Sequence, residues 1–154
     1  MYKRQELIEV LATSDLDFLC SEMVHSPFGR SWTNACLAVA RALDFPVLVR
    51  VTHFSSETIL QVLDMGAVGV VAPHIVSAAQ AADLARLSHF GNGGRGFAGA
   101  TRWAGYGTQS MVEVLAQSGR ETVVIAQIEE PEALDNVEAI AATDGIDGLF
   151  LGPS

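Results

Sequence analysis

The chain has 154 residues, of which 49% are hydrophobic and 18% charged, a composition typical of a globular protein with a large core and not of a disordered one. Its formal net charge at pH 7 is −9. We find no stretch of Lys and Arg interleaved with aromatics, so the sequence predicts no nucleic-acid partner. No apolar run approaches the roughly 20 residues of a membrane span, and we expect no membrane association.

Helical and strand-like patterns alternate along the chain. Gly66 is predicted to cap a helix in the left-handed region, and Ser77 with Gln80 to form a capping box. The expected elements are helix 3–14, strand 17–20, helix 31–43, strand 46–51, helix 56–65, strand 68–73, helix 77–87, helix 110–118, strand 122–128, a helix from 131 and strand 147–151. Five strands, each entered from a helix, predict an α/β fold with a parallel sheet, either a (β/α)8 barrel or an open doubly wound sheet.

Polar side chains gather where the predicted strands end. In a barrel these carboxyl ends form the active face, to which several strands contribute catalytic residues, so this placement favours the barrel. Each residue taken alone could equally be a loop ion pair or a helix cap. The strand-end residues are Glu22, His25, Arg50, His74, Gln127, Glu129 and Ser154.

The two cysteines carry no ligand spacing. Cys20 lies in an apolar strand-like run and Cys36 in a helical one, and neither belongs to a Cys-x-x-Cys motif. We interpret both as reduced thiols and expect a cytoplasmic protein.

Several motifs occur together and in order. They are Glu22-x-x-His25-Ser26-Pro27, Pro46-Val47-Leu48-Val49-Arg50, Leu63-Asp64-Met65-Gly66-Ala67, Gln127-Ile128-Glu129 and Gly145-Ile146-Asp147-Gly148 leading to Gly152-Pro153-Ser154. With them the chain resembles the HpcH/HpaI family of 2-oxo acid aldolases. The resemblance implies a (β/α)8 TIM barrel of the phosphoenolpyruvate/pyruvate-binding type. Since such a barrel typically needs ~250 residues, we expect residues 1–154 to be a single incomplete barrel domain of about five strands, truncated at both ends.

The resemblance also implies a metal-dependent aldolase that reversibly cleaves 4-hydroxy-2-oxo acids to pyruvate and an aldehyde. Glu129 would be one ligand of a divalent metal, and an Asp expected just after Ser154 would be the second. Oxygen ligands suit Mg²⁺ or Mn²⁺, with Co²⁺ or Zn²⁺ as alternatives. For the longer parent protein we expect a homo-oligomer.

The same resemblance assigns roles to the substrate-binding residues. Arg50 would stabilise the enolate that pyruvate forms, because a guanidinium is planar and permanently charged. Gln127 would hydrogen-bond pyruvate, and the backbone amides of Gly152 and Ser154 would receive its carboxylate. Without the resemblance, Arg50 could belong to an ion pair at the mouth of the barrel, and Glu129 could be a structural carboxylate.

His25 matches the general base of the family, a task that suits a side chain titrating near neutrality. Relatives usually carry an acidic residue directly before this histidine, where this chain has Val24. Glu22, three positions before His25, could still orient the imidazole, and we therefore expect Glu22 to act in catalysis.

Two other functions remain open. One is a coenzyme-A-ester lyase of the citrate lyase β or malyl-coenzyme-A lyase type, which would place basic residues for the coenzyme's phosphates. The other is a catalytically inactive barrel fragment. The glycine-rich segment 91–107 resembles the loop that borders the aldehyde pocket in such enzymes.

Overall fold

A computed structural model describes residues 5–23 and 29–152. The strands are β1 (Leu19–Glu22), β2 (Val47–Arg50), β3 (Gly69–Ala72), β4 (Val123–Ile128) and β5 (Gly148–Leu151). The helices are α1 (Gln5–Leu11), α2 (Arg30–Ala42), α3 (Ser56–Asp64), α4 (Ala78–Ser88), the 3₁₀ turn Gly105–Gly107, α5 (Met111–Glu121), α6 (Pro131–Asp135) and α7 (Val137–Ala141). The predicted alternation of helices and strands is confirmed.

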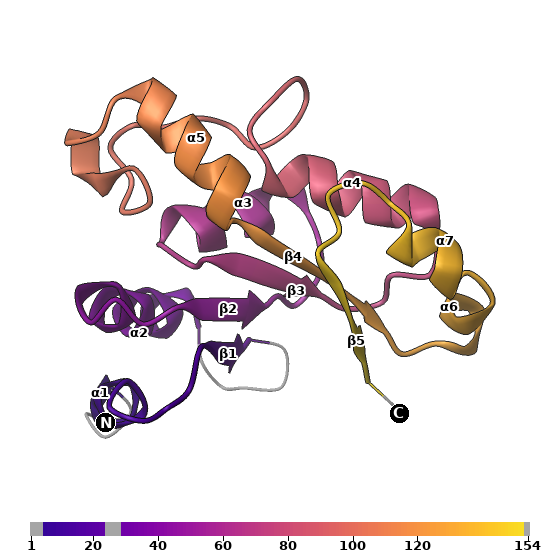
Figure 1. Ribbon diagram of the computed structural model, residues 1–154, viewed down its shortest axis with the longest axis horizontal. Coiled ribbons are helices and arrows are strands. Elements are labelled where there is room, and N and C mark those ends of the chain that lie inside the picture. Colours follow the sequence, from indigo (N-terminus) through magenta and orange to yellow (C-terminus); the bar gives the residue numbers. More distant parts are fainter. Residues whose placement is uncertain (1–4, 24–28, 153–154) are drawn as a thin grey trace.

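The five strands form one parallel sheet in the order β1-β2-β3-β4-β5 (Figure 1). Strand order therefore follows chain order without the reversal that defines a doubly wound sheet. The sheet is not closed, because β1 and β5 are its two edges. This arrangement is a partial barrel, as the sequence predicted.

Alternate residues of each strand point to opposite faces of the sheet. One face packs against the helices: Val47 and Val49 of β2, Val70 of β3, and Val124 and Ala126 of β4 belong to the main hydrophobic core. The intervening residues of these strands therefore project from the other face, which corresponds to the inside of a barrel. The site described below is built on that inner face.

The helix ends confirm most of the predicted signals. Gly66 has φ +102° and follows α3, as expected of a left-handed cap. The Ser77 hydroxyl accepts a hydrogen bond from the backbone N–H of Gln80, which is the first half of a capping box. The second half differs from the prediction, since the Gln80 side chain accepts from the Val76 N–H at 2.8 Å and not from Ser77.

Several elements differ from the sequence prediction. α1 ends at Leu11 and not at residue 14, and α5 continues to Glu121, beyond the predicted end at residue 118. β1 begins at Leu19 and runs to Glu22, because the ladder to β2 continues through polar Ser21 and Glu22 opposite Val49 and Arg50. The helix predicted from residue 131 is two short helices, α6 and α7, that meet at Asn136.

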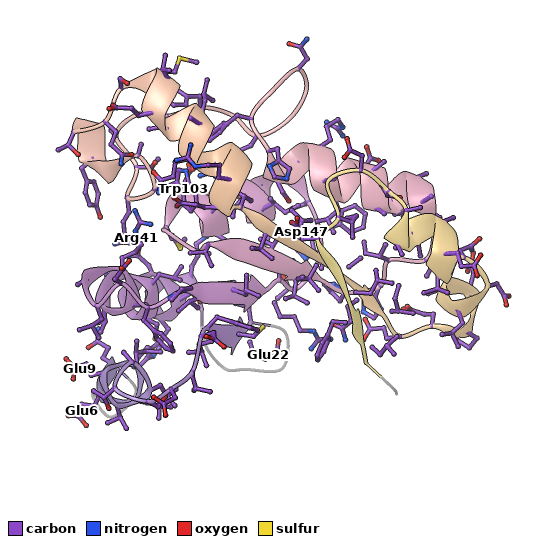
Figure 2. All side chains as sticks on the ribbon, in the orientation of Figure 1. Glu6, Glu9, Glu22, Arg41, Trp103 and Asp147 are labelled. Atoms are coloured by element: carbon purple, nitrogen blue, oxygen red, sulfur yellow. The ribbon has the colours of Figure 1, made fainter. Side chains whose placement is uncertain are left out.

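The glycine-rich segment lies at the amino ends of the strands. The Trp103 N–H donates to the Asp64 carbonyl at the end of α3, and the Arg41 guanidinium lies 5.7 Å from the Trp103 ring. Figure 2 shows Arg41 and Trp103 well apart from Glu22. The expectation that the segment borders the substrate pocket is therefore not met within this chain. In the part of the chain that the structure describes, no helix is long and apolar enough to cross a membrane.

Candidate active site

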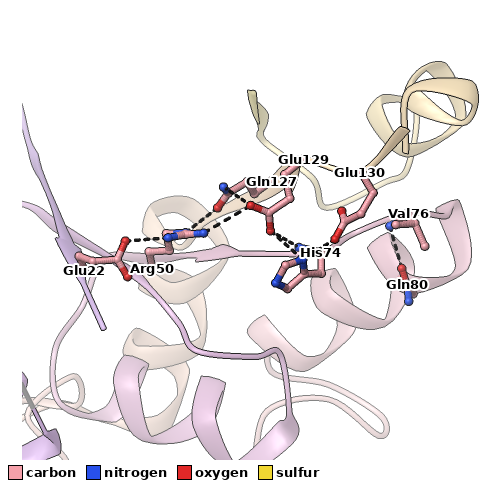
Figure 3. A network of polar contacts seen from close by, with 8 residues as sticks. All are labelled: Glu22, Arg50, His74, Val76, Gln80, Gln127, Glu129 and Glu130. Carbon is pink, nitrogen blue, oxygen red and sulfur yellow. Dashed lines mark hydrogen bonds and ion pairs between the residues drawn. The ribbon is translucent and has the colours of Figure 1, made fainter. Parts of the chain in front are cut away.

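Arg50, the last residue of β2, is the centre of a polar network at the carboxyl ends of the strands (Figure 3). Its side chain is 14% exposed. Arg50 Nε donates to Gln127 Oε1 at 2.6 Å, and Nη1 donates to Glu22 Oε2 at 2.8 Å. Nη2 lies 3.5 Å from Glu129 Oε2. The network brings together four residues that the sequence singled out, and it fixes the plane of the guanidinium.

Gln127 connects Arg50 to Glu129. It is only 4% exposed, and its Nε2 donates to Glu129 Oε2 at 2.8 Å. Both ends of the amide are therefore hydrogen-bonded within the network. A buried amide that is hydrogen-bonded at both its oxygen and its nitrogen holds one orientation, which suits it to position a ligand.

Gly152 lies directly beside Gln127. A Cβ at Gly152 would come within 2.4 Å of Gln127 Nε2, a distance that requires one of the two residues to move. The Gly152 N–H donates to the Ile128 carbonyl at 3.0 Å, so it does not supply the free backbone donor expected for a substrate carboxylate. Any contribution of Gly152 to binding comes from the space that its missing side chain leaves.

Glu129 lies between two sets of donors. Its side chain is 15% exposed. Oε2 faces Arg50 and Gln127, whereas Oε1 accepts from the His74 N–H at 3.0 Å and lies 2.9 Å from His74 Nδ1. The carboxylate is thus anchored at both oxygens, with one of them directed away from Arg50.

His74 and Glu130 belong to this cluster, although the sequence analysis gave neither a role. His74 adopts φ 60°, and its Nδ1 also contacts Glu130 Oε1. One ligand atom each from His74, Glu129 and Glu130 lies within 4.8 Å of the other two. Two features of the sequence pointed to this cluster: the position of His74 directly after β3, and the adjacent acidic residues Glu129 and Glu130.

A hollow of about 450 Å³ opens beside Glu129 and Glu130, with Leu134, Leu151 and Gly152 among its lining residues. A larger hollow, about 590 Å³ in volume, is lined by Arg41, Pro46 and Val123 among others. Pro46 and Val123 stand at the amino ends of β2 and β4, opposite the polar network. The smaller hollow is therefore the one that adjoins the candidate chemistry.

Cys20 precedes Glu22 by two residues on β1 and shares its face of the sheet. Although Cys20 is an exposed residue of β1, partial desolvation of its thiol raises the pKa, and the negative charge of Glu22 raises it further, while Arg50 acts in the opposite direction. The thiol therefore stays protonated at neutral pH. This makes it a poor candidate for a nucleophile.

Val24, His25 and Ser154, to which the sequence analysis gave weight, lie outside the described residues. Glu22 contacts Arg50, and its expected relation to His25 stays a prediction. The predicted general base and one predicted carboxylate-binding amide likewise remain predictions.

The sequence profile of the HpcH/HpaI aldolase/citrate lyase family matches residues 2–154. A 4-hydroxy-2-oxovalerate aldolase of Novosphingobium aromaticivorans is 39% identical over 153 residues, which cover 97% of this chain and 56% of the relative. A hydroxypyruvate/pyruvate aldolase of Paraburkholderia phytofirmans is 37% identical, with 95% of this chain and 58% of the relative covered. The chain thus spans somewhat more than half the length of these relatives.

Solved structures of other proteins superpose on most of this chain. A HpcH/HpaI aldolase/citrate lyase family protein from Burkholderia cenocepacia superposes with a TM-score of 0.87 at 33% identity, covering 96% of this chain and 60% of the other. A citrate synthase superposes with a TM-score of 0.82 at 26% identity, covering 96% and 56%. On its sequence and its fold, this chain belongs to the HpcH/HpaI aldolase/citrate lyase family.

Proposed function

We propose that this chain belongs to a metal-dependent pyruvate aldolase that reversibly cleaves 4-hydroxy-2-oxo acids to pyruvate and an aldehyde. The observation that carries the proposal is the convergence of Arg50, Gln127 and Glu129 at one end of the sheet. The relatives named above as aldolases support it. Because the chain spans 56 to 58% of those relatives, the activity is proposed for the whole protein.

Aldol chemistry on pyruvate removes a methyl proton, and the enolate that results needs its negative charge stabilised. Arg50 is suited to this because its guanidinium is already held in place before substrate arrives, so little reorganisation is needed. Gln127 fixes Arg50 through Nε, and the amide can exchange its hydrogen bond to Glu129 for one to pyruvate. Gly152 leaves room for this beside Gln127.

Glu129 is the proposed ligand of a divalent metal. Its carboxylate is anchored at both oxygens and borders the 450 Å³ hollow, and carboxylate oxygen is the donor that Mg²⁺ and Mn²⁺ prefer. The described residues therefore fit such an ion. When bound, a divalent ion polarises the 2-oxo group of pyruvate as a Lewis acid.

Proton transfer at the aldol hydroxyl is assigned to His25, with Glu22 nearby in sequence. Glu22 forms an ion pair with Arg50, so its charge also balances that of the guanidinium. We propose that Glu22 acts by holding Arg50 and by orienting His25. Ser154 is proposed to receive the pyruvate carboxylate.

Exchange of the pyruvate methyl protons tests the proposal. In deuterated buffer with Mg²⁺, the protein should replace the methyl protons of pyruvate with deuterium, measured by ¹H NMR. Glu129→Gln should reduce exchange to the uncatalysed rate. Glu132→Gln, a change in the exposed first turn of α6, is the matched control and should leave exchange unchanged. Exchange that persists in Glu129→Gln would remove Glu129 from the metal site.

The coenzyme-A-ester alternative draws on one observation, the likeness to a citrate synthase. Cleavage of the carbon–carbon bond of malyl-coenzyme A, and not of a 4-hydroxy-2-oxo acid, would support the alternative. Failure of the protein on both substrates would support the inactive fragment.

A further inference from the structure

We propose that His74, Glu129 and Glu130 form a second divalent-cation site, on the side of Glu129 that faces away from Arg50. The proposed ligands are His74 Nδ1, Glu129 Oε1 and Glu130 Oε1. Nδ1 lies 2.9 Å from Glu129 Oε1 and contacts Glu130 Oε1, and one ligand atom from each of the three residues lies within 4.8 Å of the other two. This inference rests on the proposed function only in sharing Glu129. It adds two residues to which that function gives no role.

The geometry of the cluster is fixed before any ion binds. The His74 N–H donates to Glu129 Oε1 at 3.0 Å, which ties the backbone of one ligand to the side chain of the next. His74 sits at φ 60°, a left-handed conformation that non-glycine residues adopt rarely and that functional sites often contain. A site held in advance binds an ion at a lower cost in ordering.

On its outer side the cluster has two carboxylates and one imidazole, whose Nδ1 contacts both Glu129 and Glu130. Arg50 and Gln127 neutralise and hydrogen-bond Glu129 Oε2, but they do not reach Glu130. Glu130 Oε2 is buried and has no hydrogen-bond partner among the described residues. A buried carboxylate oxygen without a partner is costly, and a cation bound by the Glu130 carboxylate would offset part of that cost by stabilising its negative charge.

The imidazole decides which cation the site prefers. Carboxylate and water ligands suit Mg²⁺, whereas an imidazole nitrogen suits Zn²⁺ and Co²⁺. One nitrogen with two carboxylates matches the three-ligand pattern of open zinc sites, which leave a position for water or substrate. The site should therefore take Zn²⁺ or Co²⁺ in preference to Mg²⁺.

Calorimetric titration with ZnCl₂, and separately with MgCl₂, tests the proposal without any activity assay. Zn²⁺ should bind more tightly than Mg²⁺, and His74→Asn and Glu130→Gln should each weaken Zn²⁺ binding by about 10- to 100-fold. Asn tolerates the left-handed backbone of residue 74, so this variant should fold. Glu130→Gln keeps the side-chain shape and provides the second, independent test.

Two variants serve as matched controls. His53→Asn removes an exposed imidazole that contacts Thr52, and Glu132→Gln removes a carboxylate two residues beyond Glu130; neither should change Zn²⁺ affinity. In ¹H–¹⁵N NMR of the imidazoles, one equivalent of Zn²⁺ should shift the His74 signals and leave those of His53 in place. Unaltered Zn²⁺ affinity in His74→Asn, or a shift confined to other histidines, would overturn the proposal.

The two proposals can fail separately. If Zn²⁺ binding depends on His74 and Glu130 but pyruvate exchanges no protons with any metal, the second site stands and the aldolase proposal falls. If pyruvate exchange depends on Glu129 while Zn²⁺ binding ignores His74 and Glu130, the opposite holds.

Discussion

Gly152 approaches Gln127 so closely that a Cβ at residue 152 would stand 2.4 Å from Gln127 Nε2. Gln127 is nearly fully buried and bonded at both ends of its amide, so it has little freedom to withdraw. The absence of a side chain at residue 152 therefore keeps Gln127 in contact with Arg50 and Glu129.

Gly152→Ala should displace the Gln127 amide. We expect overpacking to lower the free energy of unfolding by about 1–3 kcal/mol and pyruvate exchange to fall with it, measured by urea unfolding and by NMR. Gly119→Ala in α5, where a Cβ meets nothing within 4 Å, is the matched control and should stabilise the fold by about 0.5–1 kcal/mol. Equal effects of the two changes would contradict the close approach.

Arg50→Lys should disable the network although it keeps the charge. A single ammonium cannot replace three separate contacts of a planar guanidinium, so Gln127 and Glu129 lose fixed partners. We expect pyruvate exchange to fall by about 100-fold or more. Arg30→Lys changes an arginine that is 54% exposed and should have no effect; an Arg50→Lys variant as active as the parent would contradict the role of the guanidinium.

The thiol of Cys20 should react slowly. Because partial burial and Glu22 raise its pKa, less thiolate exists at pH 8 than for an ordinary cysteine, and alkylation by iodoacetamide should reach half its maximal rate at a higher pH. Glu22→Gln removes the negative charge and should move this midpoint downward. Both measurements are made in a Cys36→Ser background. A midpoint that does not respond to Glu22→Gln would show that the charge does not act on the thiol.

Arg95 should be important for stability and not for the chemistry. Its side chain is fully buried and pairs with Asp64 at 2.6 Å, with its guanidinium 4.5 Å from the Phe90 ring. Burial lowers the pKa of Arg95, and Asp64 opposes this. Arg95→Met should lower the free energy of unfolding by about 3 kcal/mol, because it leaves Asp64 without its partner.

The double variant Asp64→Asn/Arg95→Met should recover part of that loss, since no unpaired charge remains. Thermal unfolding monitored by circular dichroism provides both values. A double variant less stable than Arg95→Met alone would show that Asp64 is held by contacts other than the ion pair.

Much of the architecture could be predicted from the sequence because the strands are short, β-branched and separated by helices with clear end signals. β1 was placed two residues too early, since hydrophobicity cannot show that Ser21 and Glu22 continue the ladder with β2. The helix expected from residue 131 is broken at Asn136, and Leu134 in its first part is 60% exposed.

The network around Arg50 was predicted as a group because parallel strands bring their carboxyl ends to one edge. Its exact contacts were not predictable, since hydrogen bonds such as that between Arg50 Nε and Gln127 Oε1 depend on side-chain rotamers. His74 was overlooked as a partner of Glu129 because its backbone contact arises from a left-handed φ, which no neighbouring glycine or turn motif signals.

The partners of Arg50 stand 28, 77 and 79 residues away along the chain, and the nearest of them, Glu22, is on the outermost strand. Amide hydrogen exchange at β1 should therefore be faster than at β3 or β4, which have neighbours on both sides. Each transient opening of β1 would break the hydrogen bond from Arg50 Nη1 to Glu22, while Gln127 would still accept a hydrogen bond from Arg50 Nε. The site would thus loosen in stages from β1 inward, and a ligand that bridges Glu22 and Arg50 would slow exchange at β1 first.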